Sequence, residues 1–155
     1  MIKKLSSKYR IPDPDPMYNS VLLNVLIIHI LKNGKKTLSR KIVYECIKFI
    51  NINADEAIKT LEKAIKKVTP LVEVKSRRIG GSTYQVPIEV KIYRGINLAF
   101  RWIIKSAKKR PGKSMSMKLA NEIIDAANGV GNSIRKKEEA HKMAEANKAF
   151  AHYRY

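Results

Sequence analysis

The segment VEVKSRRIGGSTYQVPIEVKI, residues 72–92, decides the fold. Apolar and polar residues alternate on either side of Gly80-Gly81, and a period of two is typical of β-strands. The segment therefore predicts one β-hairpin, with strands over 72–78 and 83–92. Because a two-stranded ribbon alone is marginally stable in water, we expect its base to rest on other elements and its tip to project.

The rest of the chain predicts helices, because its apolar residues recur at the helical spacing. We expect Ser20 to cap the first helix, Asn33-Gly34 to end it, and Ser133 to cap the last one. The remaining helices are expected after the sequence GKKT, from Asn53 to Pro70, and over 96–110, 115–128 and 133–149. The fold class predicted is mainly α: a single domain of about six helices with one protruding β-hairpin.

The N-terminal residues 1–18 predict an extended basic arm. The prolines of IPDPDP fix φ and remove backbone donors, which opposes both helix and sheet. The helical domain would then span residues 19–155. The cations of the expected arm are Lys3, Lys4, Lys8 and Arg10.

The charge of the chain indicates a polyanionic partner. It carries 32 Lys and Arg against 13 Asp and Glu, a net charge of +19. Residues 70–115 hold eleven basic and two acidic residues, +9, and residues 32–48 hold six against one, +5. Self-repulsion of this size is relieved when an anion binds, so nucleic acid is the expected partner and an acidic membrane its competitor. No membrane span is expected, because the apolar stretch 21–31 is too short.

Two basic clusters are the candidate binding residues. One is a stripe on the helix expected over 96–110, and the other flanks the glycine pair of the hairpin, where backbone amides can approach a phosphate. A basic stripe is usually only a solvated helix face, but such faces normally mix both signs and this one does not. The stripe consists of Arg101, Lys105, Lys108 and Lys109, and the hairpin cluster of Lys75, Arg77 and Arg78. The terminal aromatics around Arg154 could stack on unpaired bases or pack on the domain.

The sequence shows no catalytic constellation, and we expect neither an enzyme nor a cofactor nor a metal site. The single Cys46 falls in an apolar helical stripe, which predicts a buried thiol, and the three histidines lack metal-ligand spacing. Trp102 is expected to pack in the core. No pair of carboxylates was expected in an apolar setting.

Three motifs resemble a known family. They are the hairpin segment at 72–90, KSMSMKLANEIIDAA at 113–127 and MAEANKAFAHYR at 143–154. Together, in this order, they resemble ribosomal protein seven of the small subunit, in its bacterial and organellar form. The resemblance implies six helices with one protruding hairpin, and binding to the 3′ major (head) domain of small-subunit rRNA early in assembly. It also implies neighbouring head and platform ribosomal proteins as partners, with the hairpin near exit-site tRNA and mRNA.

The resemblance also implies the individual contacts and the compartment. The expected rRNA contacts are Lys3, Lys4, Lys8, Arg10, Lys35, Lys36, Lys75, Arg77, Arg78, Arg94, Arg101, Lys105, Lys108, Lys109, Arg110, Lys113 and Met115. The expected hairpin tip, near tRNA and mRNA, comprises Arg78, Ile79, Gly80, Gly81, Ser82 and Tyr84. The expected contacts of the C-terminal helix and tail are Lys142, Lys148, Tyr153 and Arg154. Within the family, the segment 108–143 and the ending in two aromatics around Arg154 look similar to plastid versions, which implies an organelle-encoded protein of the plastid ribosome, with the bacterial cytoplasm as the alternative.

An architectural DNA-binding protein with a basic β-arm is the alternative function. Such arms usually place an apolar wedge at the tip, and here only Ile79 is available.

Overall fold

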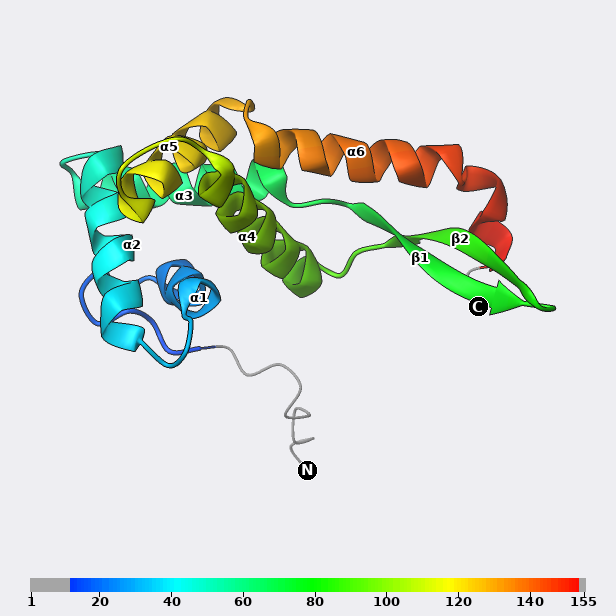
Figure 1. Ribbon diagram of the computed structural model, residues 1–155, viewed down its shortest axis with the longest axis horizontal. Helices are drawn as coiled ribbons and strands as arrows, with labels where there is room; N and C mark the ends of the chain where they lie inside the picture. The colour runs from blue at the N-terminus through cyan, green and yellow to red at the C-terminus, as the bar shows by residue number, and fades with distance from the viewer. Residues whose placement is uncertain (1–11, 154–155) are drawn as a thin grey trace.

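Six α-helices and one antiparallel β-hairpin form the described part of the chain, residues 12–153, in the computed structural model (Figure 1). This confirms the predicted mainly α class. The helices are α1 (Val21–Ile30), α2 (Lys36–Ile50), α3 (Ala54–Val68), α4 (Ile92–Lys109), α5 (Met115–Asn128) and α6 (Asn132–Ala146). The strands are β1 (Val72–Ile79) and β2 (Ser82–Glu89), and the 3-10 helix η2 (Lys148–Tyr153) follows α6.

The hydrophobic core surrounds α5, which packs against α2, α3 and α4. Helices with one apolar stripe must bury it against a neighbour, and here the stripes converge on Leu61, Phe100 and Ile123. Cys46 is fully buried in this core and Trp102 packs against it, as predicted.

The second strand is shorter than predicted, because α4 begins early. The alternation continues through Ile92, but β2 ends at Glu89 and α4 starts at Ile92, whose side chain is 81% exposed. Gly95, in the first turn of α4, lies so close to the end of α3 that a Cβ there would be 2.8 Å from Thr69 Cγ2. The start of α4 is therefore decided by packing, which a period of two cannot report.

The predicted helix ends are correct in part. Ser20 caps α1 as expected, its Oγ accepting from the amide of Leu23 at 3.4 Å. However, α1 ends at Ile30, and Asn33-Gly34 instead adopts positive φ in the turn that leads into α2. The prediction for Ser133 was wrong, because Gly131 is the cap of α6 and Ser133 Oγ donates to Glu122. Likewise α6 ends at Ala146, and η2 takes over.

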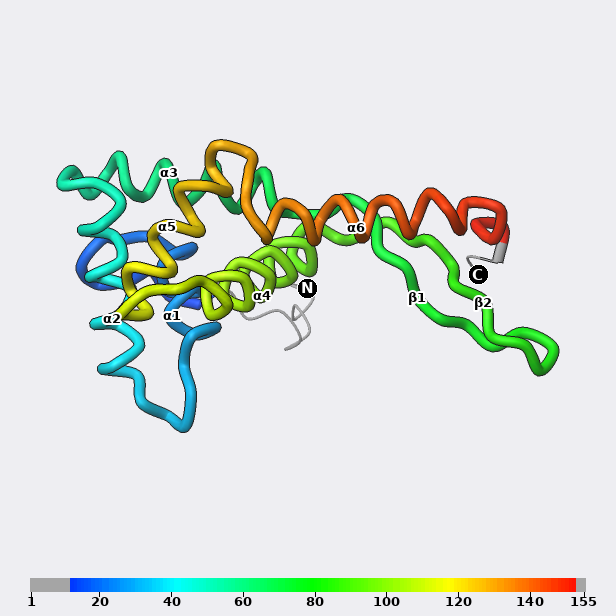
Figure 2. Tube along the Cα trace, turned by 45° about the horizontal axis from the view of Figure 1, so that its top comes forward, coloured from blue at the N-terminus to red at the C-terminus, as the bar shows by residue number. Residues whose placement is uncertain are grey.

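Two parts are visible in Figures 1 and 2: a body of helices α1–α5, and an arm, by which we mean β1, β2, α6 and η2. The hairpin and α6 both extend away from the body, and η2 returns to β2 at their far end. The amide of Leu71 donates to His141 Nε2 at 3.2 Å, and the rings of Tyr84 and Phe150 lie 5.5 Å apart. The hairpin therefore projects together with α6 and not alone.

Residues 12–19 pack on α1 and α2, so the part of the predicted arm that is described does not extend freely. Asp15 is 1% exposed and accepts hydrogen bonds from the amide of Met17 and from Tyr44 Oη, the latter at 2.9 Å. Packing therefore begins several residues before Asn19. The predicted cations Lys3, Lys4, Lys8 and Arg10 lie outside the described residues. Within residues 12–153, no helix has the length and apolar character needed to cross a membrane.

Candidate nucleic-acid interface

A groove begins where the end of α1 and the start of α2 meet the last turns of α4. This first hollow has a volume of about 510 Å³, and Lys32, Lys35 and Lys108 all line it. Lys35 and Lys108 are far apart in sequence. The fold therefore places residues of the two most basic segments, 32–48 and 70–115, on one hollow. The apolar side chains of Leu38 and Ile104 also line this hollow, so the ammonium groups lie next to a mainly apolar surface.

The groove continues along α4 to the base of the hairpin. Four hollows follow one another, and each shares lining residues with the next. The first and second share His29, Ile104 and Lys108. The second and third share Arg101, and the third and fourth share Arg94. Since α4 has 18 residues, its axis is about 27 Å long. We call this surface the basic groove. Its basic and histidine side chains are His29, Lys32, Lys35, Lys75, Lys91, Arg94, Arg101, Lys105 and Lys108, and its other polar lining residues are Asn33, Ser39, Glu73, Glu89, Tyr93 and Asn97.

The centre of the basic groove is uncompensated positive charge. Arg101, Lys105 and Lys108 are exposed, and none forms an ion pair within residues 12–153. On an ordinary helix face, acidic residues three or four positions away would pair with such cations. The positive charges of Arg101, Lys105 and Lys108 are therefore not neutralised within the described residues, and an external anion could neutralise them.

The hairpin end of the groove is partly neutralised. Glu73 pairs with Arg94 at 2.8 Å and with Lys75 at 3.7 Å, and both cations remain about half exposed. Arg94, an expected rRNA contact, is thus engaged by an internal carboxylate. The positive potential should therefore be strongest toward the α1–α2 turn.

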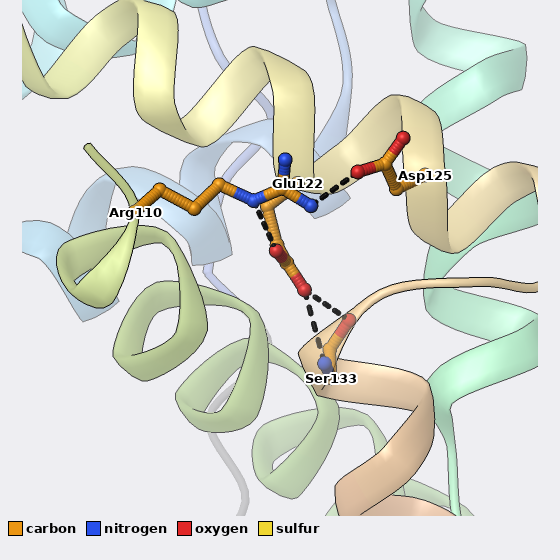
Figure 3. Close-up of polar contacts among 4 residues, drawn as sticks. All are labelled: Arg110, Glu122, Asp125 and Ser133. Atoms are coloured by element: carbon orange, nitrogen blue, oxygen red, sulfur yellow. Dashed lines mark hydrogen bonds and ion pairs between the residues drawn. The ribbon is translucent and has the colours of Figure 1, made fainter. Parts of the chain in front are cut away.

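Arg110, also expected at the rRNA surface, lies in an internal network instead (Figure 3). Its Nε donates to the fully buried Glu122 at 2.5 Å, and its guanidinium also pairs with Asp125. Burial alone would lower the pKa of Arg110, but the hydrogen bonds to Asp125 and Glu122 outweigh it and hold the pKa above its ordinary value. The sequence did not predict that Glu122 is fully buried, whereas Asp125 remains 38% exposed. The charge of Arg110, whose side chain is 21% exposed, is thus compensated within the protein by these two carboxylates.

The hairpin tip is exposed and its turn is tight. Gly80 and Gly81 both have positive φ, +56° and +90°, which suits a two-residue hairpin turn. Arg77 lies opposite Tyr84 in the register and Arg78 opposite Thr83, so the two arginines point to opposite faces of the ribbon. Tyr84 was expected at the tip, but it lies within β2 and packs on Phe150 of η2.

The remaining predicted residues lie at varied distances from the groove. Met115 lines it while packing partly on the core, whereas Lys36, Lys109 and Lys113 are exposed beside it. Lys142 and Lys148 are exposed on the arm. The side chain of Tyr153, and Arg154 entirely, lie outside the described residues.

Sequence reasoning missed several groove residues, among them His29, Lys32, Lys91 and Asn97. Lys32 had a signal, since it begins the charged segment counted above, but His29 looked like a core residue. In the structure His29 is half-buried, and its Nδ1 lies 2.8 Å from the carbonyl oxygen of Val25, which requires a proton on that nitrogen. Its ring lies 5.3 Å from that of Phe100, at the edge of the core.

The described residues contain no cluster of three or more potential metal ligands. Burial raises the pKa of Cys46 to about 12, which makes the thiol unreactive as a nucleophile near neutral pH.

Comparison with known proteins gives consistent matches over nearly the whole chain. Residues 2–148 match the sequence profile of the family described as ribosomal protein S7p/S5e. The chain is 62% identical over 142 residues to small ribosomal subunit protein uS7c of Cyanidium caldarium, covering 91% of each chain. It is 56% and 53% identical over 156 residues to small ribosomal subunit protein uS7 of Thermosynechococcus vestitus and Acaryochloris marina, covering 100% of each chain.

Proposed function

The chain belongs to the ribosomal protein S7p/S5e family, a structural component of the small ribosomal subunit and not an enzyme, and on that premise we propose that its basic groove binds small-subunit rRNA. The RNA target proposed is the 3′ major domain, which forms the head of the subunit. Binding there would help to organise the folding of the head during assembly.

One observation carries the proposal: a groove along α4 whose central cations have no acidic partner within the described residues. Arg101, Lys105 and Lys108 lie on one face of α4, with Lys32 and Lys35 on the opposite wall. A folded RNA offers rows of phosphates, and each phosphate that replaces a condensed counterion on binding adds a favourable, salt-dependent contribution. Because the cations sit on helices, their spacing is fixed before the RNA arrives.

The arm suggests further contacts in the assembled subunit. Its tip carries Arg78 beside a tight glycine turn and is exposed, which suits an RNA surface near the exit-site tRNA and mRNA. The exposed residues of α6 mix both signs, with Glu138, Glu139 and Glu145 beside Arg135 and Lys142, so this face suits a neighbouring ribosomal protein better than the all-basic stripe of α4 does.

We propose the plastid ribosome as the location, with the bacterial cytoplasm as the alternative. The support is the identity to the Cyanidium plastid protein, 62% against 56% and 53% for the cyanobacterial proteins. Peptides of this chain in ribosomes purified from plastids would agree with the proposal, and their presence in bacterial ribosomes would contradict it.

A competition assay tests the proposed function. The protein is titrated against a head-domain rRNA fragment in near-physiological salt, with duplex DNA and an unrelated folded RNA of equal length as competitors. Preference for the rRNA fragment by tenfold or more is expected, since shape and unpaired bases add to the charge. Equal affinity for duplex DNA would contradict the proposal and favour the architectural DNA-binding alternative.

The hairpin contribution is tested by changing Arg77 and Arg78 together to Ala. The slope of the logarithm of affinity against the logarithm of salt concentration should fall by about 1 to 2, at roughly 0.7 to 0.9 per lost phosphate contact. Because the two side chains point to opposite faces, the single variants should differ, with Arg78→Ala the more severe. An unchanged slope in the double variant would remove the hairpin from the interface.

A further inference from the structure

Glu122 lies in the middle of α5, and both oxygens of its carboxylate accept hydrogen bonds. It is 0% exposed. Its Oε2 accepts from Arg110 Nε at 2.5 Å, and its Oε1 accepts from Ser133, from the amide at 3.0 Å and from Oγ at 2.7 Å (Figure 3). A buried charge is retained only where such partners compensate for its lost hydration.

The network joins the three elements that meet where the arm leaves the body. Arg110 caps the end of α4, Glu122 and Asp125 belong to α5, and Ser133 lies in the first turn of α6. The carboxylate of Glu122 thereby connects the end of one helix to the beginning of another through a third.

The turn between α5 and α6 is fitted around these carboxylates. Gly131 caps α6 with φ +102°, a conformation that favours glycine. A Cβ at Gly131 would lie 3.3 Å from Glu122 Oε1 and 3.3 Å from Asp125 Cβ, and 3.6 Å from the Arg110 guanidinium. A side chain at position 131 would therefore require both an unfavourable backbone conformation and a shift of Glu122 or Asp125.

Small changes of angle at this point have large effects at the end of the arm. α6 has 15 residues, about 22 Å of axis, so a tilt of about 10° at Ser133 would move its far end by about 4 Å. That end continues into η2, which holds β2 through Phe150 and Tyr84. The direction of α6 therefore influences where the hairpin lies.

We infer that Glu122, with Arg110 and Asp125, is a positioning device that fixes the direction of the arm relative to the body. Buried ion pairs contribute little net stability compared with well-packed apolar side chains, but they can select one geometry among several. Arg110 thus serves RNA binding indirectly, by aligning the arm with the basic groove. The inference rests on the proposed function only in the statement that the arm takes part in RNA binding.

The test measures the arm geometry in the free protein. Spin labels are attached at Lys63→Cys, exposed on α3, and Ser82→Cys, exposed at the hairpin tip, and the distance distribution is recorded by double electron–electron resonance. The native Cys46 is fully buried and burial raises its pKa to about 12, so we expect it not to react with the label at neutral pH. Because no RNA is present, the result does not depend on whether the groove binds RNA.

The decisive variant replaces Arg110 and Glu122 together by Met. An apolar pair should keep the melting temperature near or above that of the wild type, while the distance distribution broadens about twofold or shifts by about 4 Å. A second variant, Ser133→Ala, keeps the ion pair and the fold but removes one contact of α6, and a smaller broadening is expected. Glu45→Gln is the matched control, because Glu45 accepts from Ser116 and the network on α6 does not include it.

Two outcomes decide the inference. Broadening in the double Met variant and in Ser133→Ala, with an unchanged distribution in Glu45→Gln, supports it. A wild-type distribution in both test variants, whatever their melting temperatures, would show that the network only stabilises the fold.

Discussion

Lys108 and Arg110 lie two residues apart at the end of α4, yet their surroundings differ completely. Lys108 is exposed in the basic groove without an acidic partner, whereas Arg110 is held by Glu122 and Asp125. Both were predicted to contact rRNA, because sequence shows charge but not what faces it. The structure separates them into a candidate RNA contact and an internal ion pair.

We predict opposite effects of changing these two residues to Ala. Lys108→Ala should alter the free energy of unfolding by less than about 0.5 kcal/mol and reduce the salt slope of RNA binding by about 0.7 to 0.9. Arg110→Ala should lower the free energy of unfolding by about 3 kcal/mol, because it leaves the buried Glu122 carboxylate uncompensated. Urea unfolding and filter binding measure the two quantities. Equal destabilisation by both changes would contradict this division.

Cys46 provides a second prediction at the residue scale. With its pKa raised to about 12 by burial, the folded protein should show almost no reaction with a disulfide reagent at about pH 8, where an ordinary thiol reacts readily. In guanidinium chloride one thiol per chain should react. Rapid labelling without denaturant would show that the core around α2 opens.

The two carboxylates that pair with Arg110, the buried Glu122 and the partly exposed Asp125, could be recognised from their spacing in the sequence but not from composition. Glu122 and Asp125 stand three positions apart in ANEIIDAA, hence on neighbouring parts of one helix face, between residues that are buried. Their partner Arg110 belongs to the preceding helix, and no spacing rule links the two. The charges could be read from the sequence, but their pairing depends on how α4 and α5 pack.

The hairpin is the element that the sequence predicts best, whereas the packing of α6 beside it was not predicted, although the helix itself was expected over 133–149 and is found at Asn132–Ala146. Alternation and the Gly-Gly pair are local features, and both strands appear where expected except at Val90–Ile92. The contacts that tie the hairpin to α6 join residues about seventy positions apart, such as Leu71 with His141. Local periodicity carries no information on such pairs.

The contact between α6 and the hairpin base should depend on pH. Burial and the nearby Lys137 ammonium lower the pKa of His141, whose neutral ring accepts the Leu71 amide at Nε2. As the pH falls through about 6.5, the unfolded chain binds a proton that the folded chain does not, so the free energy of unfolding decreases until the lower folded pKa is reached. Above about pH 6.5 the contribution is complete.

A comparison with His141→Gln isolates this effect from the other two histidines. Gln does not titrate and can still accept the amide hydrogen. Between about pH 7.5 and pH 5.5, the wild type should lose more stability than the variant, by an amount that solvent screening keeps small. Parallel curves for the two proteins would show that His141 does not couple protonation to folding.

At the scale of the whole molecule, part of the net charge of +19 gathers along one groove. Counting charge by segment predicts that 32–48 and 70–115 carry the surplus, and the fold places the ends of both segments on the walls of one groove. Which cations share that groove could not be predicted, because it is formed by the packing of α1, α2 and α4. Exposed lysines on α3 contribute to the same total charge and line no part of it.

The measurement that tests this account most directly compares two triple variants of equal charge. One changes Arg101, Lys105 and Lys108 in the basic groove to Ala, and the other changes the exposed α3 residues Lys59, Lys63 and Lys66. For a head-domain rRNA fragment, we predict that the groove variant lowers the salt slope by about 2 to 3, whereas the α3 variant leaves it nearly unchanged. Equal decreases in the two variants would contradict a localised interface and indicate that the RNA responds only to net charge.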